Sequence, residues 1–129
     1  MNRMRIGELA ERTGLSQRTI HFYEERGLIA PSEREGRGYR YYDETTLKRL
    51  EKIAALKDIG LSLEEIADVI DLYFVDETGI LGKRRVLEIL HGHLSETENR
   101  LSALQGFRKD VKANIKRLED LIEEAKKSR

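Results

Sequence analysis

A short segment at residues 16–28, SQRTIHFYEERGL, gathers several side chains that bind nucleic acid well. Arg18 and Arg26 carry guanidinium groups that pair with phosphate or guanine, and His21 and Tyr23 can donate hydrogen bonds to either group. Apolar residues lie between them at helical spacing. The segment predicts an amphipathic helix with a polar face suited to DNA, although a polar surface helix of a small bundle would show the same mixture.

The distribution of charge supports the DNA interpretation more than the total does. The whole chain has 24 Lys+Arg and 24 Asp+Glu, and a net charge of zero argues mildly against a nucleic-acid binder. Residues 1–42, however, contain eight Arg and no Lys, against six Glu. Such a set favours bidentate recognition of phosphate or guanine, although arginine-rich codon usage would produce the same bias.

Several classes of protein are disfavoured by what the sequence lacks. There is no cysteine, which excludes disulfides, thiolate metal sites and thiol redox sensing. No apolar stretch resembles a signal peptide or a membrane span, so we expect a soluble, cytoplasmic protein associated with the nucleoid and no membrane partner.

An enzyme is not expected either. The sequence shows no nucleophile–base pair and no phosphate-binding glycine loop, and its three histidines have no evident acidic orienting residue. His91 and His93 would point about 200° apart on a helix, so they make a poor metal site. We expect no cofactor and no metal.

The elements around the opening segment form a recognisable motif. Apolar residues predict a helix over residues 5–13, which Gly14 ends, and Ser16 is a suitable N-cap for a second helix over residues 17–26. Two short helices joined by a tight, glycine-containing turn are typical of a helix-turn-helix. Pro31 and the aromatic–basic run at residues 38–42 then predict an extended hairpin or wing over residues 29–42.

Two more helices follow the wing. Asp43 can cap a third helix that ends before Gly60, and Ser62 with Glu65 forms a capping box that opens a fourth helix ending near Tyr73. A loop is expected over residues 76–82.

The remainder carries a long apolar repeat, which we call the seam. Its positions step alternately by three and four, as in a coiled coil, and only Thr97 and Arg108 interrupt them. A helix of about 43 residues would be roughly 65 Å long, too long to bury this face on so small a domain. We therefore expect a partner helix, although the chain could instead fold back at Gly106. The seam comprises Leu87, Leu90, Leu94, Thr97, Leu101, Leu104, Arg108, Val111, Ile115, Leu118, Ile122 and Ala125.

The order of these elements, together with IGELAERTGLSQRTIHFYEERGLI (6–29) and GYRYYDETTLKRLEKIAALKDIGLSLEEIADVI (38–70), resembles the MerR family of bacterial transcriptional regulators. The resemblance covers roughly the first 70 residues and is closest to short members without a separate effector domain. It implies a mainly α fold: a winged helix-turn-helix DNA-binding domain (1–75), a linker loop (76–83) and a long antiparallel coiled-coil dimerisation helix (84–127).

The resemblance also implies site residues. The second helix would enter the major groove, and the wing and the turn after the third helix would contact phosphates. The chain departs from the family at His21-Phe22-Tyr23, where Arg-Tyr-Tyr is usual, so Phe22 is expected in the core; Glu24 and Glu25 should face inward or away from DNA. The implied DNA contacts are Gln17, Arg18, Thr19, His21, Tyr23, Arg37, Gly38, Tyr39, Arg40 and Lys57.

The resemblance also implies a mechanism. A homodimer would bind an inverted repeat in a promoter with an overlong spacer, and it would bend and untwist this DNA so that RNA polymerase can use the promoter. The dimer contacts would be the apolar seam residues Leu87, Leu90, Leu94, Leu101, Leu104, Val111, Ile115, Leu118 and Ile122. A small-molecule effector of unknown identity could bind around Tyr73, Phe74 and Phe107. A DNA-binding scaffold that recruits partners through its coiled coil, or an interaction coiled coil without DNA affinity, are the alternatives.

Overall fold

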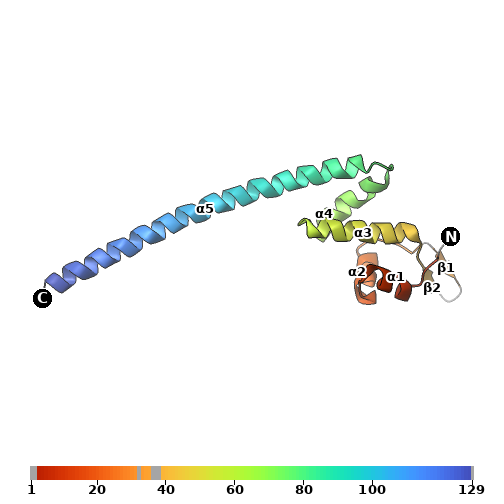
Figure 1. Ribbon diagram of the computed structural model, residues 1–129, viewed down its shortest axis with the longest axis horizontal. Helices are drawn as coiled ribbons and strands as arrows, with labels where there is room; N and C mark the ends of the chain where they lie inside the picture. The colour runs from red at the N-terminus through yellow and green to blue at the C-terminus, as the bar shows by residue number, and fades with distance from the viewer. Residues whose placement is uncertain (1–2, 32, 36–38, 129) are drawn as a thin grey trace. The chain divides into compact units, whose positions relative to one another are not determined.

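The computed structural model describes residues 3–31, 33–35 and 39–128. These residues divide into two compact units, Met1–Val86, called the head, and Leu87–Arg129, called the tail. In chain order the elements are α1 (Ile6–Thr13), α2 (Gln17–Glu25), β1 (Glu33–Glu35), β2 (Tyr39–Tyr41), α3 (Glu44–Asp58), α4 (Leu63–Val69), the 3-10 helix η1 (Ile70–Phe74) and α5 (Ile80–Lys127) (Figure 1). This order confirms the predicted winged helix-turn-helix followed by a long helix.

The turn between α1 and α2 forms as its sequence predicts. Gly14 adopts a left-handed conformation with φ of 73°, and its amide donates to the carbonyl of Ala10 at 2.9 Å. Ser16 then caps α2, because its hydroxyl accepts a hydrogen bond from the amide of Thr19 at 3.1 Å. Both ends of the turn are therefore fixed by local hydrogen bonds.

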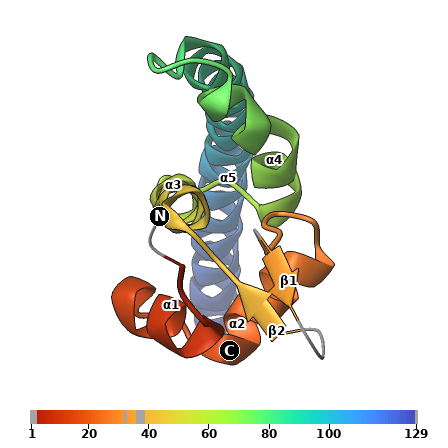
Figure 2. The ribbon, with the colours of Figure 1, turned by 90° about the vertical axis from the view of Figure 1, so that its right-hand side faces the viewer.

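The predicted wing is a two-stranded antiparallel hairpin of β1 and β2, in which Glu33 pairs with Tyr41 (Figure 2). Arg37 and Gly38 of the predicted wing lie outside the described residues. The hairpin is joined to the chain's beginning by an isolated bridge, in which Met4 and Tyr42 exchange two backbone hydrogen bonds of 2.7 Å. Both side chains are buried, so the bridge also brings the hairpin onto the core.

The helices α3 and α4 are bounded by the predicted caps. One carboxylate oxygen of Asp43 accepts from the amides of Thr45 and Thr46 at the start of α3. At the start of α4, Ser62 and Glu65 exchange side-chain-to-amide hydrogen bonds of 2.9 and 3.1 Å, which is the predicted capping box. The core between these helices and the helix-turn-helix consists of fully buried apolar side chains, among them Leu9, Ile20, Leu50, Ile53 and Ile66.

The long helix α5 has 48 residues and continues through Gly106, so the chain does not fold back there. It begins at Ile80, within the segment expected to be a loop. The reason is local: Asp76 accepts from the amides of Thr78 and Gly79, and the Thr78 hydroxyl accepts from the amide of Ile80. These bonds satisfy amides that a helix start leaves unpaired. Within the described part of the chain, no helix is both long and apolar enough to cross a membrane.

Candidate nucleic-acid interface

The helix α2 has two faces, as expected of a helix that reads DNA. Ile20 is fully buried against the head, whereas Gln17, Arg18 and His21 are exposed. Thr19, at the edge of this face, is half-buried and its hydroxyl lies 2.9 Å from that of Ser16. Three of the residues predicted to contact DNA thus share one solvent-facing surface, and a fourth borders it.

Tyr23, another residue of α2 predicted to contact DNA, is buried. Only 3% of its surface is exposed, so the ring belongs to the core of the head. The Nζ atom of Lys57 lies 3.4 Å from the Tyr23 hydroxyl and donates to it. Any contact of Tyr23 with DNA is therefore restricted to its hydroxyl, which Lys57 already holds. Lys57 itself is exposed, so its ammonium group remains accessible to a phosphate.

The prediction that Phe22 lies in the core is wrong. Phe22 is 37% exposed, and the guanidinium carbon of Arg26 lies 5.0 Å from the centre of its ring. The two aromatic residues are adjacent on α2, so about 100° separates them and only one can face inward. Tyr23 takes that place. Phe22 instead supports Arg26 through a cation–π contact.

The two acidic residues of α2 differ. Glu24 is half-buried and accepts a hydrogen bond from the hydroxyl of Tyr42, so it faces inward as predicted. Glu25 is exposed in the last turn of α2. Its carboxylate opposes phosphate there, so the favourable part of α2 is its first half, around Arg18.

The strand β2 of the hairpin carries two further residues that were predicted to contact DNA. Tyr39 and Arg40 belong to β2. Next to them, Tyr41 lies beneath the guanidinium of Arg3, with 4.2 Å between the guanidinium carbon and the ring centre. Sequence reasoning did not select Arg3, and the early arginine cluster was its only signal.

Arg49 is a second residue that the sequence did not reveal. Its Nε and Nη2 atoms donate to the carbonyl of Leu28, just after α2, at 3.0 and 2.8 Å, and its Nη1 donates to Asp71 of η1 at 2.9 Å. The guanidinium carbon also lies 5.7 Å from the ring centre of Phe74. One side chain of α3 therefore holds the end of the helix-turn-helix and the connection toward α5.

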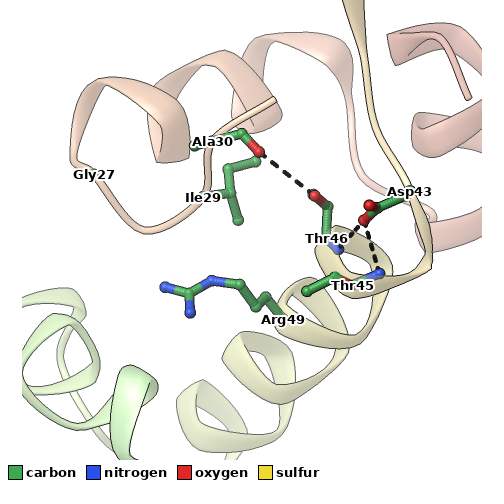
Figure 3. Close-up of a pocket in the computed structure, with 7 residues that line it drawn as sticks. All are labelled: Gly27, Ile29, Ala30, Asp43, Thr45, Thr46 and Arg49. Carbon is green, nitrogen blue, oxygen red and sulfur yellow. Dashed lines mark hydrogen bonds between the residues drawn. The ribbon is translucent and has the colours of Figure 1, made fainter. Parts of the chain in front are cut away.

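Arg49 borders the cavity drawn in Figure 3, of about 460 Å³. The charged groups of this cavity are used within the head, since Asp43 caps α3 and Arg49 binds Leu28 and Asp71. Thr46 likewise lies 3.5 Å from the carbonyl of Ala30, to which its hydroxyl donates. The cavity therefore lies between the segment after α2 and the first turns of α3, and the side chains of Asp43, Thr46 and Arg49 that line it are already hydrogen-bonded within the head.

The residues predicted to hold a small ligand have separate surroundings. The face of Tyr73 lies against Gly82, where an added Cβ would approach the ring to 2.4 Å, and the Nζ atom of Lys52 lies 4.6 Å from the ring centre. Burial raises the pKa of the Tyr73 phenol. Phe74 is 40% exposed and lines a shallow cavity of about 300 Å³ on α3. Phe107 belongs to the tail and is 66% exposed.

The seam residues predicted to form a dimer are arranged along α5. Leu90 is half-buried, and the others are exposed in the single chain, with exposed fractions from 37% for Val111 to 64% for Leu104. An isolated helix with such a face has apolar surface left to bury. Among the described residues there is no group of three potential metal-binding side chains.

Comparison with known proteins assigns the chain to a family. Residues 4–72 match the family described as MerR HTH family regulatory protein, and residues 47–114 match the family described as MerR, DNA binding. The chain belongs to the MerR family of helix-turn-helix transcriptional regulators. The resemblance inferred from the helix-turn-helix and wing motifs is thereby confirmed.

Particular MerR relatives support the assignment. Nodulation protein NolA of Bradyrhizobium elkanii is 41% identical over 96 residues, which are 74% of this chain but 39% of NolA, so the chain spans about two fifths of that relative. The HTH-type transcriptional regulator CueR of Salmonella typhi is 33% identical over 111 residues, covering 85% of this chain and 78% of CueR. The structure of PbrR691 from Ralstonia metallidurans CH34, in complex with lead(II), is similar with a TM-score of 0.67 and 28% identity, over 84% of this chain and 82% of that one.

Proposed function

We propose that this MerR-family chain is a homodimeric regulator that binds an inverted repeat in double-stranded promoter DNA and distorts the DNA for RNA polymerase. The observation that carries the proposal is the exposed first half of α2, where Gln17, Arg18 and His21 face solvent while Ile20 anchors the helix. A helix held in this way can enter a major groove with its N-terminal residues against base edges.

Arg18 is the residue we assign to base recognition. Its guanidinium is exposed in the first turn of α2, where a fork of donors can pair with the acceptor edge of guanine. Lys57 and the wing residues Arg37, Gly38, Tyr39 and Arg40 are assigned to phosphate, which sets affinity and its dependence on salt. His21 is placed on the same face as Arg18, with its role limited to a hydrogen bond.

Dimerisation through the tail is the second part of the proposal. The seam leaves leucine side chains such as Leu101 and Leu104 more than half exposed, and a second α5 would bury them. A dimer with two-fold symmetry presents two copies of α2, which explains why an inverted repeat would be its target. Distortion of the spacer between the half-sites then adds a deformation energy that the regulator controls.

This function can be tested in two steps. Bound sequences are first selected from a random DNA library, and the selected site is then used for footprinting and in vitro transcription. We expect protection of an inverted repeat together with a change in transcript level. Protection without such a change would support the scaffold alternative, and no binding even at low salt would overturn the proposal.

A paired substitution sharpens the test. Arg18→Ala should weaken specific binding by about 1–3 kcal/mol and relax discrimination at one base pair of each half-site, whereas Lys57→Ala should weaken all sequences evenly and reduce the salt slope by about one. Arg117→Ala in the tail removes the same charge and should leave both quantities unchanged. Equal, sequence-independent losses for Arg18→Ala and Lys57→Ala would contradict the assigned roles.

A further inference from the structure

The exposed side of α2 carries a row of three side chains spaced four residues apart. Arg18, Phe22 and the C-cap residue Arg26 are all exposed, and this spacing places them one after another over about 12 Å of the helix. Within the described part of the chain, neither guanidinium has a carboxylate partner. An apolar ring therefore lies between two cations on the helix that the proposed function assigns to DNA.

Contacts on two sides hold the ring of Phe22. The guanidinium carbon of Arg26 lies 5.0 Å from the ring centre, and the ring of Tyr23 lies 6.2 Å away between centres and is tilted by 47°. Tyr23 is itself buried in the head, so it is a rigid neighbour. Phe22 nevertheless remains 37% exposed. The rest of the ring surface is therefore apolar, accessible and held in one orientation.

The location of Phe22 matters more than its exposure, because single exposed apolar side chains are common on protein surfaces. Phe22 adjoins Arg18 and His21, which belong to the surface proposed to enter the major groove. A phenyl ring has no hydrogen-bonding group with which to bind a phosphate or a polar base edge. Glu25 also offsets the charge of the neighbouring Arg26, so this turn of α2 favours an uncharged contact.

The major-groove edge of DNA offers one apolar group, the C5-methyl of thymine. We propose that Phe22 is a specificity-determining residue that packs against this methyl group in each half-site. This inference rests on the proposed function and gives it a second base contact, whose chemistry differs from that of Arg18. The ring recognises the methyl group by removing it from water, whereas the guanidinium recognises guanine by hydrogen bonds.

The spacing of Arg18 and Phe22 limits where the thymine lies. The two residues are about 6 Å apart along the helix axis, and successive base pairs are about 3.4 Å apart along DNA. A helix that lies along the groove therefore brings these side chains to bases one or two steps apart. The half-site should contain a thymine, on either strand, within two base pairs of the guanine that Arg18 contacts.

Replacing thymine by deoxyuridine removes this methyl group and leaves the hydrogen-bonding groups of the base unchanged. Each thymine of the selected site is replaced in turn, in both half-sites at once, and fluorescence anisotropy at fixed salt measures the affinity of the unmodified chain. One replacement should weaken binding by roughly fifteenfold, because one buried methyl group contributes about fourfold in each half-site. The other thymines are matched controls and should change affinity by less than about twofold, because their replacement alters no phosphate contact.

Substitution of Phe22 identifies the side chain that recognises the methyl group. Phe22→Ala should bind the thymine and deoxyuridine forms of the site with affinities within about twofold of each other, since little apolar surface remains at this position. Phe22→Leu keeps an apolar side chain and should retain most of the preference for thymine. Arg26→Gln removes the cation from the ring and should weaken both forms equally. Thermal unfolding shows whether each variant is folded, and the scan with the unmodified chain needs no variant.

The proposal is overturned if the selected half-site lacks such a thymine, or if the unmodified chain binds every deoxyuridine form as tightly as the thymine form. It is also overturned if the preference for thymine persists in Phe22→Ala, or if Phe22→Leu loses it as completely as Phe22→Ala does. These results leave the proposed function intact, because specific binding and distortion of DNA do not require this contact. A chain that binds no selected DNA, even at low salt, overturns both proposals.

Discussion

The head and the tail are built from similar proportions of apolar residues but use them differently. In the head, Leu9, Ile20, Ile53 and Ile66 are fully buried by other parts of the same unit. In the tail, Leu101, Leu104 and Ile115 are each more than half exposed. The head therefore buries its own apolar side chains, whereas the apolar seam of the tail is left exposed in the single chain. The proposed function assigns this exposed seam to a second copy of α5.

The largest expected effect concerns the tail. Leu101→Asp in both copies should weaken the dimer by about 3–6 kcal/mol, because each buried leucine contributes roughly 1.5–3 kcal/mol and a charge replaces it. Sedimentation equilibrium measures the loss. Ser95→Asp introduces the same charge on an exposed side of α5 and should leave the dimer intact. A dimer that survives Leu101→Asp would show that the seam is not the interface.

The same substitution made in each unit distinguishes their sources of stability. Ile53→Ala should lower the free energy of unfolding of the head by about 2–5 kcal/mol at every protein concentration, because the side chain is fully buried within one chain. Ile115→Ala should instead produce a loss that depends on concentration, as expected when burial requires association. Thermal unfolding followed by circular dichroism over a hundredfold concentration range measures both. If the losses caused by Ile53→Ala and Ile115→Ala depended on protein concentration to the same extent, the two units would not differ in their source of stability.

Alanine substitutions at two glycines of α5 should change the free energy of unfolding by smaller amounts and in opposite directions. Gly82→Ala should destabilise by about 1–3 kcal/mol, because the new methyl would lie 2.4 Å from an atom of the Tyr73 ring. Gly106→Ala should stabilise by about 0.5–1 kcal/mol, since nothing lies within 4 Å of the added methyl and alanine favours helix. Chemical denaturation measures both changes. A stabilising Gly82→Ala would mean that the first turn of α5 does not pack on Tyr73.

A further small effect concerns a cap in the head. Ser62→Ala should cost about 0.5–2 kcal/mol, because the amide of Glu65 loses its acceptor at the start of α4. Ser62→Thr retains a hydroxyl and should cost less than half as much. Urea denaturation of the two variants measures the difference. Equal losses would assign the effect to packing and not to the hydrogen bond.

What the sequence predicted correctly follows from local signals. The Gly14 turn, the Ser16 cap and the Ser62–Glu65 capping box depend on residues within three or four positions of each other, and all of them form. The inward position of Tyr23 was harder to predict, because two adjacent aromatic residues differ by only one step of rotation around α2. Periodicity alone does not decide between them.

Contacts between distant residues were not predictable in this way. Arg49 binds the carbonyl of Leu28, which is 21 positions earlier, and Asp71, which is 22 positions later. An arginine on a charged helix shows no sign of such partners. Gln17, Arg18 and His21 share one exposed surface because their spacing along the α2 helix brings them together.

The contacts of Arg49 predict which segments of the head unfold together. Its guanidinium satisfies the carbonyl that follows α2 and a carboxylate of η1 at the same time, with only 19% of its side chain exposed. Losing this side chain would release both segments together. Amide hydrogens at the end of α2 and in η1 should therefore exchange with solvent as one cooperative unit in the native protein, and as two independent units in Arg49→Ala.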